Sequence, residues 1–238
     1  MIPQSKGKLF LADERGLNQL DWYRSYNTFN FGSYQHEHKV PFSDLYVLND
    51  DTLASGKSIC MCVEEHSAVI LIPVVGAIEY MDNSGDIKLI EPGNVQLLDL
   101  PVGSRFQINN LYEEEMVNFL HLWVKTKKSN NQQEVAFDLL RNKNQLIEIF
   151  KLENAIGYLG QFDGRAEAVL PVSNPGNSLF AFVIDGEFEV QYRLMHARDG
   201  LVLWEINEAE LEALSNNAVI MLLEIGKVNN HSGVLANH

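Results

Sequence analysis

Short apolar runs separated by turn residues extend from residue 8 to 124, and they predict strands rather than helices. Residues 8–55 contain β-branched and aromatic runs, broken at Gly, Pro and Asn-Asp positions, with no amphipathic helix of any length. Such spacing is typical of an all-β sandwich or barrel. The segments are KLFLADERG, DWYRSYNTFNFGSY and FSDLYVLNDDTLASG.

The same pattern is clearest between Gly56 and Val124. A hairpin turn is predicted at 82–86, DNSGD, and a second turn at Pro92-Gly93. In the strand 58–64, residues Cys60, Cys62 and Glu64 share one face, and the intervening apolar residues share the other. Phe106 and Ile108 likewise share a face of a later strand. The predicted strands are 58–64, 69–75, 77–81, 87–91, 95–98, the one around 106–108, and 116–124.

Residues 144–228 repeat this pattern in weakened form, with Asp185-Gly186 corresponding to the turn at Gly76. The polar, aperiodic run KTKKSNNQQE between the halves predicts a linker. We therefore expect domains at 1–125 and 144–228, a linker at 126–143 and a flexible tail at 229–238. One short helix is predicted at 208–215, where Leu211 and Leu214 lie opposite acidic residues.

Composition and charge argue against several classes of function, namely binding to nucleic acid and to membranes. The chain of 238 residues has a formal net charge of −14 and an isoelectric point near 4.8, so nucleic-acid backbones and anionic membranes are repelled at long range. The longest apolar run, 68–78, is too short to span a bilayer. The N-terminus lacks signal-peptide features, and two cysteines form no disulfide framework. We expect a cytoplasmic protein that binds neither nucleic acid nor membrane directly.

Together, the spacing of a β run ending at Gly76 and a later G…P-x-G segment resembles the paired motifs of the cupin superfamily. The segments ERG…DWYRSYNTFNFGSY, LYVLNDD, IEYMDNSGD and LHLWV are similar to the pirin family of bicupins, over about residues 9–125. The resemblance implies two antiparallel jelly-roll β-barrels packed face to face, with little helix. Some members of that family are quercetin 2,3-dioxygenases, and others are nuclear transcription co-regulators.

The resemblance also implies a metal, because family members typically bind iron or another divalent ion through His-x-His and His-x-Glu. Carried over to this chain, the four positions are Cys62, Glu64, Phe106 and Ile108. Two of the four have no donor atom, and if they point inward they fill the metal's volume with hydrocarbon. The chain thus resembles the bacterial pirin-like proteins that lack metal ligands, and we expect no metal and no cofactor.

Two function classes remain from this reasoning. The first is a metal-free bicupin that binds a small molecule or a regulatory protein without catalysis. The second is a metal-dependent dioxygenase of the quercetinase type. Acid–base chemistry by Glu64 is a third alternative, which requires a pocket and a raised pKa. The oligomeric state is not indicated by the sequence.

Several other side chains each allow a structural and a functional interpretation. Cys60 and Cys62 are either small buried hydrophobic residues or a redox-active pair. Glu64 lies either at a solvated barrel mouth or inside as a functional acid. His121 is either a hydrogen-bonded core residue or, with Cys60, part of a pocket. The remaining histidines of interest are predicted in exposed loops: His36 and His38 of QHEHK, and His66.

Overall fold

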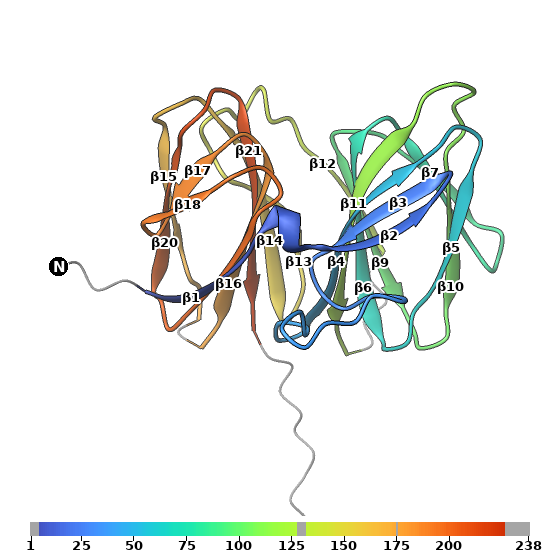
Figure 1. Cartoon of the computed structure of the whole chain (residues 1–238), viewed down its shortest axis with the longest axis horizontal. Helices are drawn as coiled ribbons and strands as arrows, with labels where there is room; N and C mark the ends of the chain where they lie inside the picture. The colour runs from blue at the N-terminus through green and yellow to red at the C-terminus, as the bar shows by residue number, and fades with distance from the viewer. Residues whose placement is uncertain (1–4, 128–131, 175, 227–238) are drawn as a thin grey trace, which may run out of the picture.

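The protein is built from four antiparallel sheets that form two similar domains side by side (Figure 1). This architecture comes from a computed structural model, which describes residues 5–127, 132–174 and 176–226. A single 3-10 turn, η1 (Ala12–Glu14), is the only helical element among them. No helix in the described ranges is long and apolar enough to cross a membrane. The predicted all-β bicupin architecture is therefore confirmed.

The N-terminal domain pairs a seven-stranded sheet, in the order β12-β9-β6-β11-β4-β3-β2, with a four-stranded sheet, β5-β10-β7-β8. The strands of the larger sheet are β2 (Gly16–Leu20), β3 (Tyr23–Asn27), β4 (Leu45–Leu53), β6 (Ser67–Val75), β9 (Asn94–Leu100), β11 (Val117–Lys125) and β12 (Gln133–Ala136). Those of the smaller sheet are β5 (Ser58–Cys62), β7 (Ile78–Asp82), β8 (Ile87–Ile90) and β10 (Arg105–Asn109).

The C-terminal domain pairs a six-stranded sheet, β1-β19-β16-β21-β14-β13, with a four-stranded sheet, β15-β20-β17-β18. Its larger sheet contains β1 (Lys6–Phe10), β13 (Ile147–Lys151), β14 (Ala155–Phe162), β16 (Ser178–Asp185), β19 (Gly200–Trp204) and β21 (Ala218–Ile225). Its smaller sheet contains β15 (Glu167–Pro171), β17 (Phe188–Val190), β18 (Arg193–Met195) and β20 (Glu208–Ala213). In each domain the two sheets form separate ladders, so the predicted barrels are open sandwiches.

The two large sheets pack against each other in the centre of the molecule. One core cluster joins residues of both, including Ile70 and Leu122 from one domain and Phe180 and Leu223 from the other. The opposite face of each large sheet packs on its own small sheet, giving a second and a third cluster. Because both faces are covered, strands such as β6 are almost wholly apolar instead of alternating. Most of the continuous run at 68–78 thus belongs to β6 in the central layer, and its last residue begins β7 of the small sheet.

Strand pairing departs from the predicted division of the chain in two places. β1 lies within the predicted domain 1–125, yet it pairs with β19 of the C-terminal domain. β12 lies within the predicted linker 126–143, yet it pairs with β9 of the N-terminal domain. β1 and β12 each form an edge of one of the two large sheets. Composition along the chain does not reveal which sheet such a strand joins. The expected tail at 229–238 lies outside the described residues.

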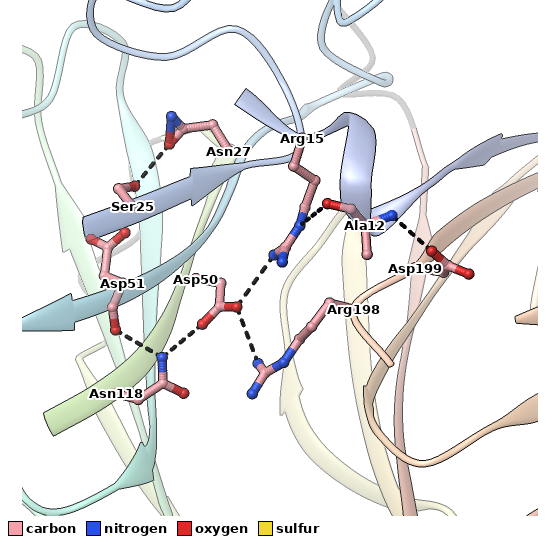
Figure 2. Close-up of polar contacts among 9 residues, drawn as sticks. All are labelled: Ala12, Arg15, Ser25, Asn27, Asp50, Asp51, Asn118, Arg198 and Asp199. Atoms are coloured by element: carbon pink, nitrogen blue, oxygen red, sulfur yellow. Dashed lines mark hydrogen bonds and ion pairs between the residues drawn. The ribbon is translucent and has the colours of Figure 1, made fainter. Parts of the chain in front are cut away.

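A polar cluster fixes β1 and η1 between the domains (Figure 2). Asp50 accepts hydrogen bonds from Arg15 at 3.3 Å and from Asn118 at 2.7 Å, and it lies 3.5 Å from the Arg198 guanidinium. Asp199 accepts the backbone N–H of Ala12 at 2.8 Å. Burial lowers the pKa of Arg15, and the adjacent Asp50 carboxylate opposes that change. The segment from Ala12 to Arg15, which connects β1 with β2, is therefore held between the domains by paired charges.

The predicted helix at 208–215 is wrong, because this segment forms strand β20. Its inward residues are Ala209, Leu211 and Ala213, while Glu208 and Glu210 face outward. This strict two-residue alternation suits a half-buried strand and overrides the helix propensity of Glu, Ala and Leu.

The internal repeat is visible at two matching turns. Gly76 and Gly186 both have left-handed backbones, with φ of +73° and +77°. A Cβ on Gly76 would lie 2.9 Å from Val117, and one on Gly186 would lie 2.7 Å from Ala218. Each glycine is therefore required both by the turn and by the close approach of the following sheet.

Candidate functional site

A cleft of about 650 Å³ opens in the N-terminal domain, where its two sheets meet at edge strands β2 and β5. The residues that surround it come from both sheets and from the loop 30–35. They are Asn18, Gln19, Leu20, Tyr23, Asn30, Phe31, Gly32, Ser33, Gln35, Tyr46, Val47, Ile59, Cys60, Met61, Cys62, Glu64 and Trp123. The volume suits a small organic ligand.

The loop that forms one wall of the cleft is tied to β2. Asn18 accepts a hydrogen bond from Ser33 at 2.8 Å and donates one to the carbonyl of Phe31 at 3.4 Å. The ring of Tyr34 lies so close to Gly16 that a Cβ there would be 2.2 Å away. Only glycine at position 16 allows the loop to pack this closely, and the wall is therefore fixed to β2 by these contacts.

The inner surface of the cleft is aromatic. Tyr23, Phe31, Tyr46 and Trp123 line it, and the ring of Trp123 makes edge contacts with Phe31 at 5.6 Å and Tyr46 at 5.9 Å. The Tyr23 hydroxyl donates to Asp51 at 2.7 Å, and that of Tyr46 lies 2.5 Å from Ser67 Oγ. Because both hydroxyls have internal partners, these tyrosines offer mainly their rings to a ligand.

Both phenols stay protonated at neutral pH. Burial raises the pKa of Tyr46 to about 12, against an opposing hydrogen bond from Ser67. Burial, and then the negative charge of Asp51, raise the pKa of Tyr23 well above its ordinary range. The inner surface of the cleft therefore carries no phenolate charge.

The four positions of the family's metal ligands do not converge in this structure. Phe106 and Ile108 are buried in the N-terminal core, with 2% and 0% exposure. The Phe106 ring lies 5.8 Å from that of Tyr80 and 6.0 Å from that of Trp123. These two residues thus point inward and form hydrocarbon core, as the motif alignment predicted.

Cys62, by contrast, does not fill the interior, so the interpretation of the two cysteines as small buried hydrophobic residues is wrong. The strand register places Met61 opposite Phe106 and Ile59 opposite Ile108. Inward positions on β5 are therefore the odd-numbered ones, and Cys60, Cys62 and Glu64 lie on the exposed side. Both cysteines are free thiols at the rim of the cleft. The reading of Glu64 as a residue at a solvated mouth agrees with its exposure.

The residues present do not fit a metal of the family's kind. Two of the corresponding side chains are hydrocarbon in the core, and the other two point away from them to the outside. Within the described ranges, no group of three or more His, Cys, Asp or Glu residues is arranged to hold a metal ion. A mononuclear centre needs several donors that converge from more than one strand, and this barrel does not provide them.

His121 is fully buried below the aromatic surface, on the same side of its sheet as Trp123. Its Nε2 atom lies 3.1 Å from Oδ2 of Asp51, which is also fully buried and accepts the hydrogen bond of Tyr23. His121 itself does not line the cleft. Sequence reasoning missed Asp51 and Tyr23, although the alternation of β4 places Asp51 on the same face as buried Val47 and Leu53.

The remaining histidines lie apart from this cluster. His36 and His38 are exposed, as predicted, and His36 Nδ1 accepts the backbone N–H of His38 at 3.1 Å. His66 was predicted to be exposed, but it is half-buried, with its Nε2 atom 2.8 Å from Asp99.

Two antiparallel sandwiches packed through their large sheets, one with a cleft at its open edge, define a bicupin. Residues 152–225 match the family described as "Quercetinase C-terminal cupin domain". The quercetin 2,3-dioxygenase of Escherichia coli K12 is 20% identical over 219 residues, which cover 88% of this chain and 95% of that protein. The pirin-like protein YhaK of the same organism is 25% identical over 113 residues, 48% of each chain. Together with the fold, these similarities support a pirin-family cupin protein.

Solved structures agree with this fold. The bacterial pirin YhhW from E. coli, in complex with nickel(II), superposes with a TM-score of 0.82 at 19% identity, covering 94% of this chain and 100% of that one. YhaK from E. coli superposes with a TM-score of 0.71 at 20% identity, covering 85% and 93%. At these identities the comparison establishes the architecture and leaves the site to be argued from its own residues.

Proposed function

We propose that this protein binds a flat aromatic small molecule in the N-terminal cleft and does not carry out metal-dependent dioxygenase chemistry. The observation that carries this proposal is the burial of Phe106 and Ile108 in the core, at the positions where relatives of the quercetinase type would place metal ligands. The N-terminal sandwich has the overall architecture of its relatives, and the packing of these two side chains in its core supports the absence of a metal there.

The cleft itself supports the choice of ligand. Its aromatic rings offer stacking and edge contacts, and its rim residues, such as Asn30 and Gln35, offer amide donors and acceptors. Glu64 at the rim and the net charge of −14 disfavour a strongly anionic ligand. A neutral or weakly acidic aromatic compound with hydroxyl or carbonyl groups meets these conditions. Such binding suits a regulatory role, in which a bound ligand changes the affinity for a partner protein.

A quercetin 2,3-dioxygenase is the second candidate. It is favoured by the curated relatives that carry this name and align over 88% of the chain. In that case the chain's own residues would still supply only the cleft, because the donor set needed for the metal does not converge.

The two candidates are separated by measuring quercetin binding and quercetin consumption on the same protein. Binding is followed by quenching of tryptophan fluorescence, since Trp123 lines the cleft. Consumption is followed by absorbance and oxygen uptake, with iron, nickel or manganese added. We expect saturable quenching and no consumption above that of the free metal ions. Metal-dependent turnover would contradict the proposal in favour of the dioxygenase, and absence of quenching would contradict the choice of ligand.

We also propose that the protein acts in the cytoplasm. Its two exposed cysteines are unpaired, which suits a reducing compartment. Mass analysis of alkylated protein from a cell extract should find both thiols in the reduced form, whereas stable mixed disulfides would argue for an oxidising location.

A further inference from the structure

Buried polar side chains form one continuous patch on the inner face of the large N-terminal sheet. They lie on the neighbouring strands β3, β4 and β11, and all of them have 0% exposure. The strand register places Asn49 directly opposite both Asn27 and His121, and it places Asp51 opposite Ser25. Side chains that lie opposite each other on one face are about 5 Å apart. The members of this polar patch are Ser25, Asn27, Asn49, Asp51 and His121.

Several polar atoms of the polar patch have no hydrogen-bond partner among the residues that the structure describes. They are Asn27 Nδ2, Asn49 Nδ2 and Oδ1, Asp51 Oδ1 and His121 Nδ1. The other carboxylate oxygen of Asp51 accepts from Tyr23, and the side-chain oxygen of Asn27 accepts from Ser25. Unpartnered buried polar atoms cost free energy, and folded proteins contain few of them. A contiguous set of donors and acceptors therefore points to a bound group that can both donate and accept.

The polar patch lies directly behind the aromatic surface of the cleft. Tyr23 lines the cleft, and its hydroxyl is 2.7 Å from the Asp51 carboxylate. The centroid of the His121 ring is 5.8 Å from that of Phe31 and 5.9 Å from that of Trp123, which both line the cleft. Phe31 is half-buried and belongs to loop 30–35. Rotation of this one side chain is enough to bring the cleft and the polar patch into contact.

We infer that the polar patch is a subsite of the cleft for a phenolic hydroxyl, so that the ligand is a neutral hydroxylated aromatic compound. This inference rests on the proposed aromatic-binding function and specifies its ligand class. A hydroxyl donates one hydrogen bond and accepts others, which matches the unpartnered oxygen of Asp51 and the amide groups of Asn27 and Asn49. A hydrocarbon in the same position leaves these atoms unpaired, and a carboxylate is repelled by Asp51.

A role in ligand binding can be separated from a structural role at Asn49. Neither of its amide atoms has a partner within the described ranges, so Asn49→Leu removes no side-chain hydrogen bond of the folded protein. The substitution should leave the urea midpoint of unfolding unchanged or raise it, as expected for a group retained at a cost in stability. Asn110 is the matched control. Its buried side chain forms hydrogen bonds with the backbone of Leu53, Glu115 and Tyr112, and Asn110→Leu should lower the midpoint.

The experiment measures the affinities of the full chain for 2-naphthol and for naphthalene by equilibrium dialysis. The two ligands share their rings and differ by one hydroxyl. We expect the parent protein to bind 2-naphthol at least about tenfold more tightly, because only this ligand pairs the buried polar atoms. Asn49→Leu should remove most of that preference, whereas Asn110→Leu should retain it.

Equal affinities of the parent for the two ligands would overturn the inference, and so would a preference that Asn49→Leu retains. A lower urea midpoint for Asn49→Leu would also overturn it, because the amide would then stabilise the fold. If quercetin quenches tryptophan fluorescence in the same preparation, such a failure is confined to the hydroxyl subsite and leaves the proposed binding function standing. If neither quercetin nor the two naphthalene compounds bind, the proposed function fails with it.

Discussion

The two domains share one architecture but differ in what fills it. The inner face of the N-terminal sandwich carries the buried polar residues Ser25, Asn27, Asn49, Asp51 and His121, and a cleft opens beside them. The inner cluster of the C-terminal sandwich is hydrocarbon, with Phe162 and Phe188 in edge contact at 5.9 Å, while one buried acid, Glu224, lies near the end of β21. A buried polar group is costly unless it has partners. We infer that the N-terminal domain retains such groups for a site, while the C-terminal domain is optimised as a scaffold.

The sharpest test of this contrast compares one large aromatic residue from each core. Phe106→Ala and Phe188→Ala should each lower the free energy of unfolding by about 3 to 5 kcal/mol, because both rings are buried. Denaturant unfolding followed by circular dichroism measures the loss. Only Phe106→Ala should also alter ligand affinity, because its ring contacts Trp123 at the cleft. Equal effects of the two substitutions on ligand affinity would contradict the placement of the ligand site in the N-terminal domain. An unchanged free energy of unfolding for Phe106→Ala would contradict the burial of Phe106 in the core.

The buried polar group can be tested by removing a single hydroxyl. Tyr23→Phe deletes the donor to the buried carboxylate of Asp51 and should cost about 1.5 to 3 kcal/mol, as for hydrogen bonds to charged groups. The matched control is Tyr192→Phe in the C-terminal domain, whose half-exposed ring predicts a change of about 0.5 kcal/mol or less. Similar losses of unfolding free energy in both variants would show that the hydrogen bond from Tyr23 to Asp51 does not stabilise the fold.

In the C-terminal domain the buried acid Glu224 is held by hydrogen bonds from residues between β15 and β16. Its carboxylate accepts hydrogen bonds from Ser173 and Asn177. Burial is the largest single influence and raises its pKa, but these hydrogen bonds together outweigh it and leave the pKa below the ordinary value. A lowered pKa in the folded state means that the carboxylate stabilises the fold above the unfolded pKa of about 4.3 and that this contribution is lost as pH falls.

Glu224→Gln should therefore destabilise the protein by about 1 to 2 kcal/mol at pH 7. The difference from the parent should shrink as the pH falls through 4, because the parent carboxylate then becomes protonated. Urea unfolding at a series of pH values measures this, with the exposed Glu210→Gln as control. A difference that is constant with pH would mean that the charge of Glu224 contributes nothing.

The smallest expected effect concerns the aromatic surface of the cleft. Tyr46→Ala removes one ring wall and should weaken quercetin binding about tenfold, the worth of one good aromatic contact. Tyr112→Ala, on a partly exposed loop outside the cleft, is the control. Fluorescence titration gives both affinities, and equal values in the two variants would remove Tyr46 from the ligand site.

Much of the fold could be predicted because strand runs and turn glycines are local signals. The turns at Gly76 and Gly186 and the strands of the central layer follow from them. Pairing between distant segments is not local, which is why β1 and β12 were assigned to the wrong parts of the chain. At Glu208–Ala213 two local signals conflicted, and the two-residue alternation prevailed over helix propensity.

The site was only partly predictable for a related reason. Phe106 and Ile108 were placed correctly inward, because they continue an alternating strand. Cys62 was placed on the wrong side, because a shift of one residue reverses every side chain and the sequence does not fix the register between β5 and β10. The cleft depends on the distant loop 30–35 approaching β5, and no short-range pattern contains that contact.

The most direct test of the central claim is the metal content of protein purified without chelator, measured by elemental analysis together with quercetin affinity before and after dialysis against chelator. We predict far less than one equivalent of iron, nickel or manganese per chain, and an affinity for quercetin that chelation leaves unchanged. One equivalent of tightly held metal, whose removal abolishes quercetin binding, would contradict the account.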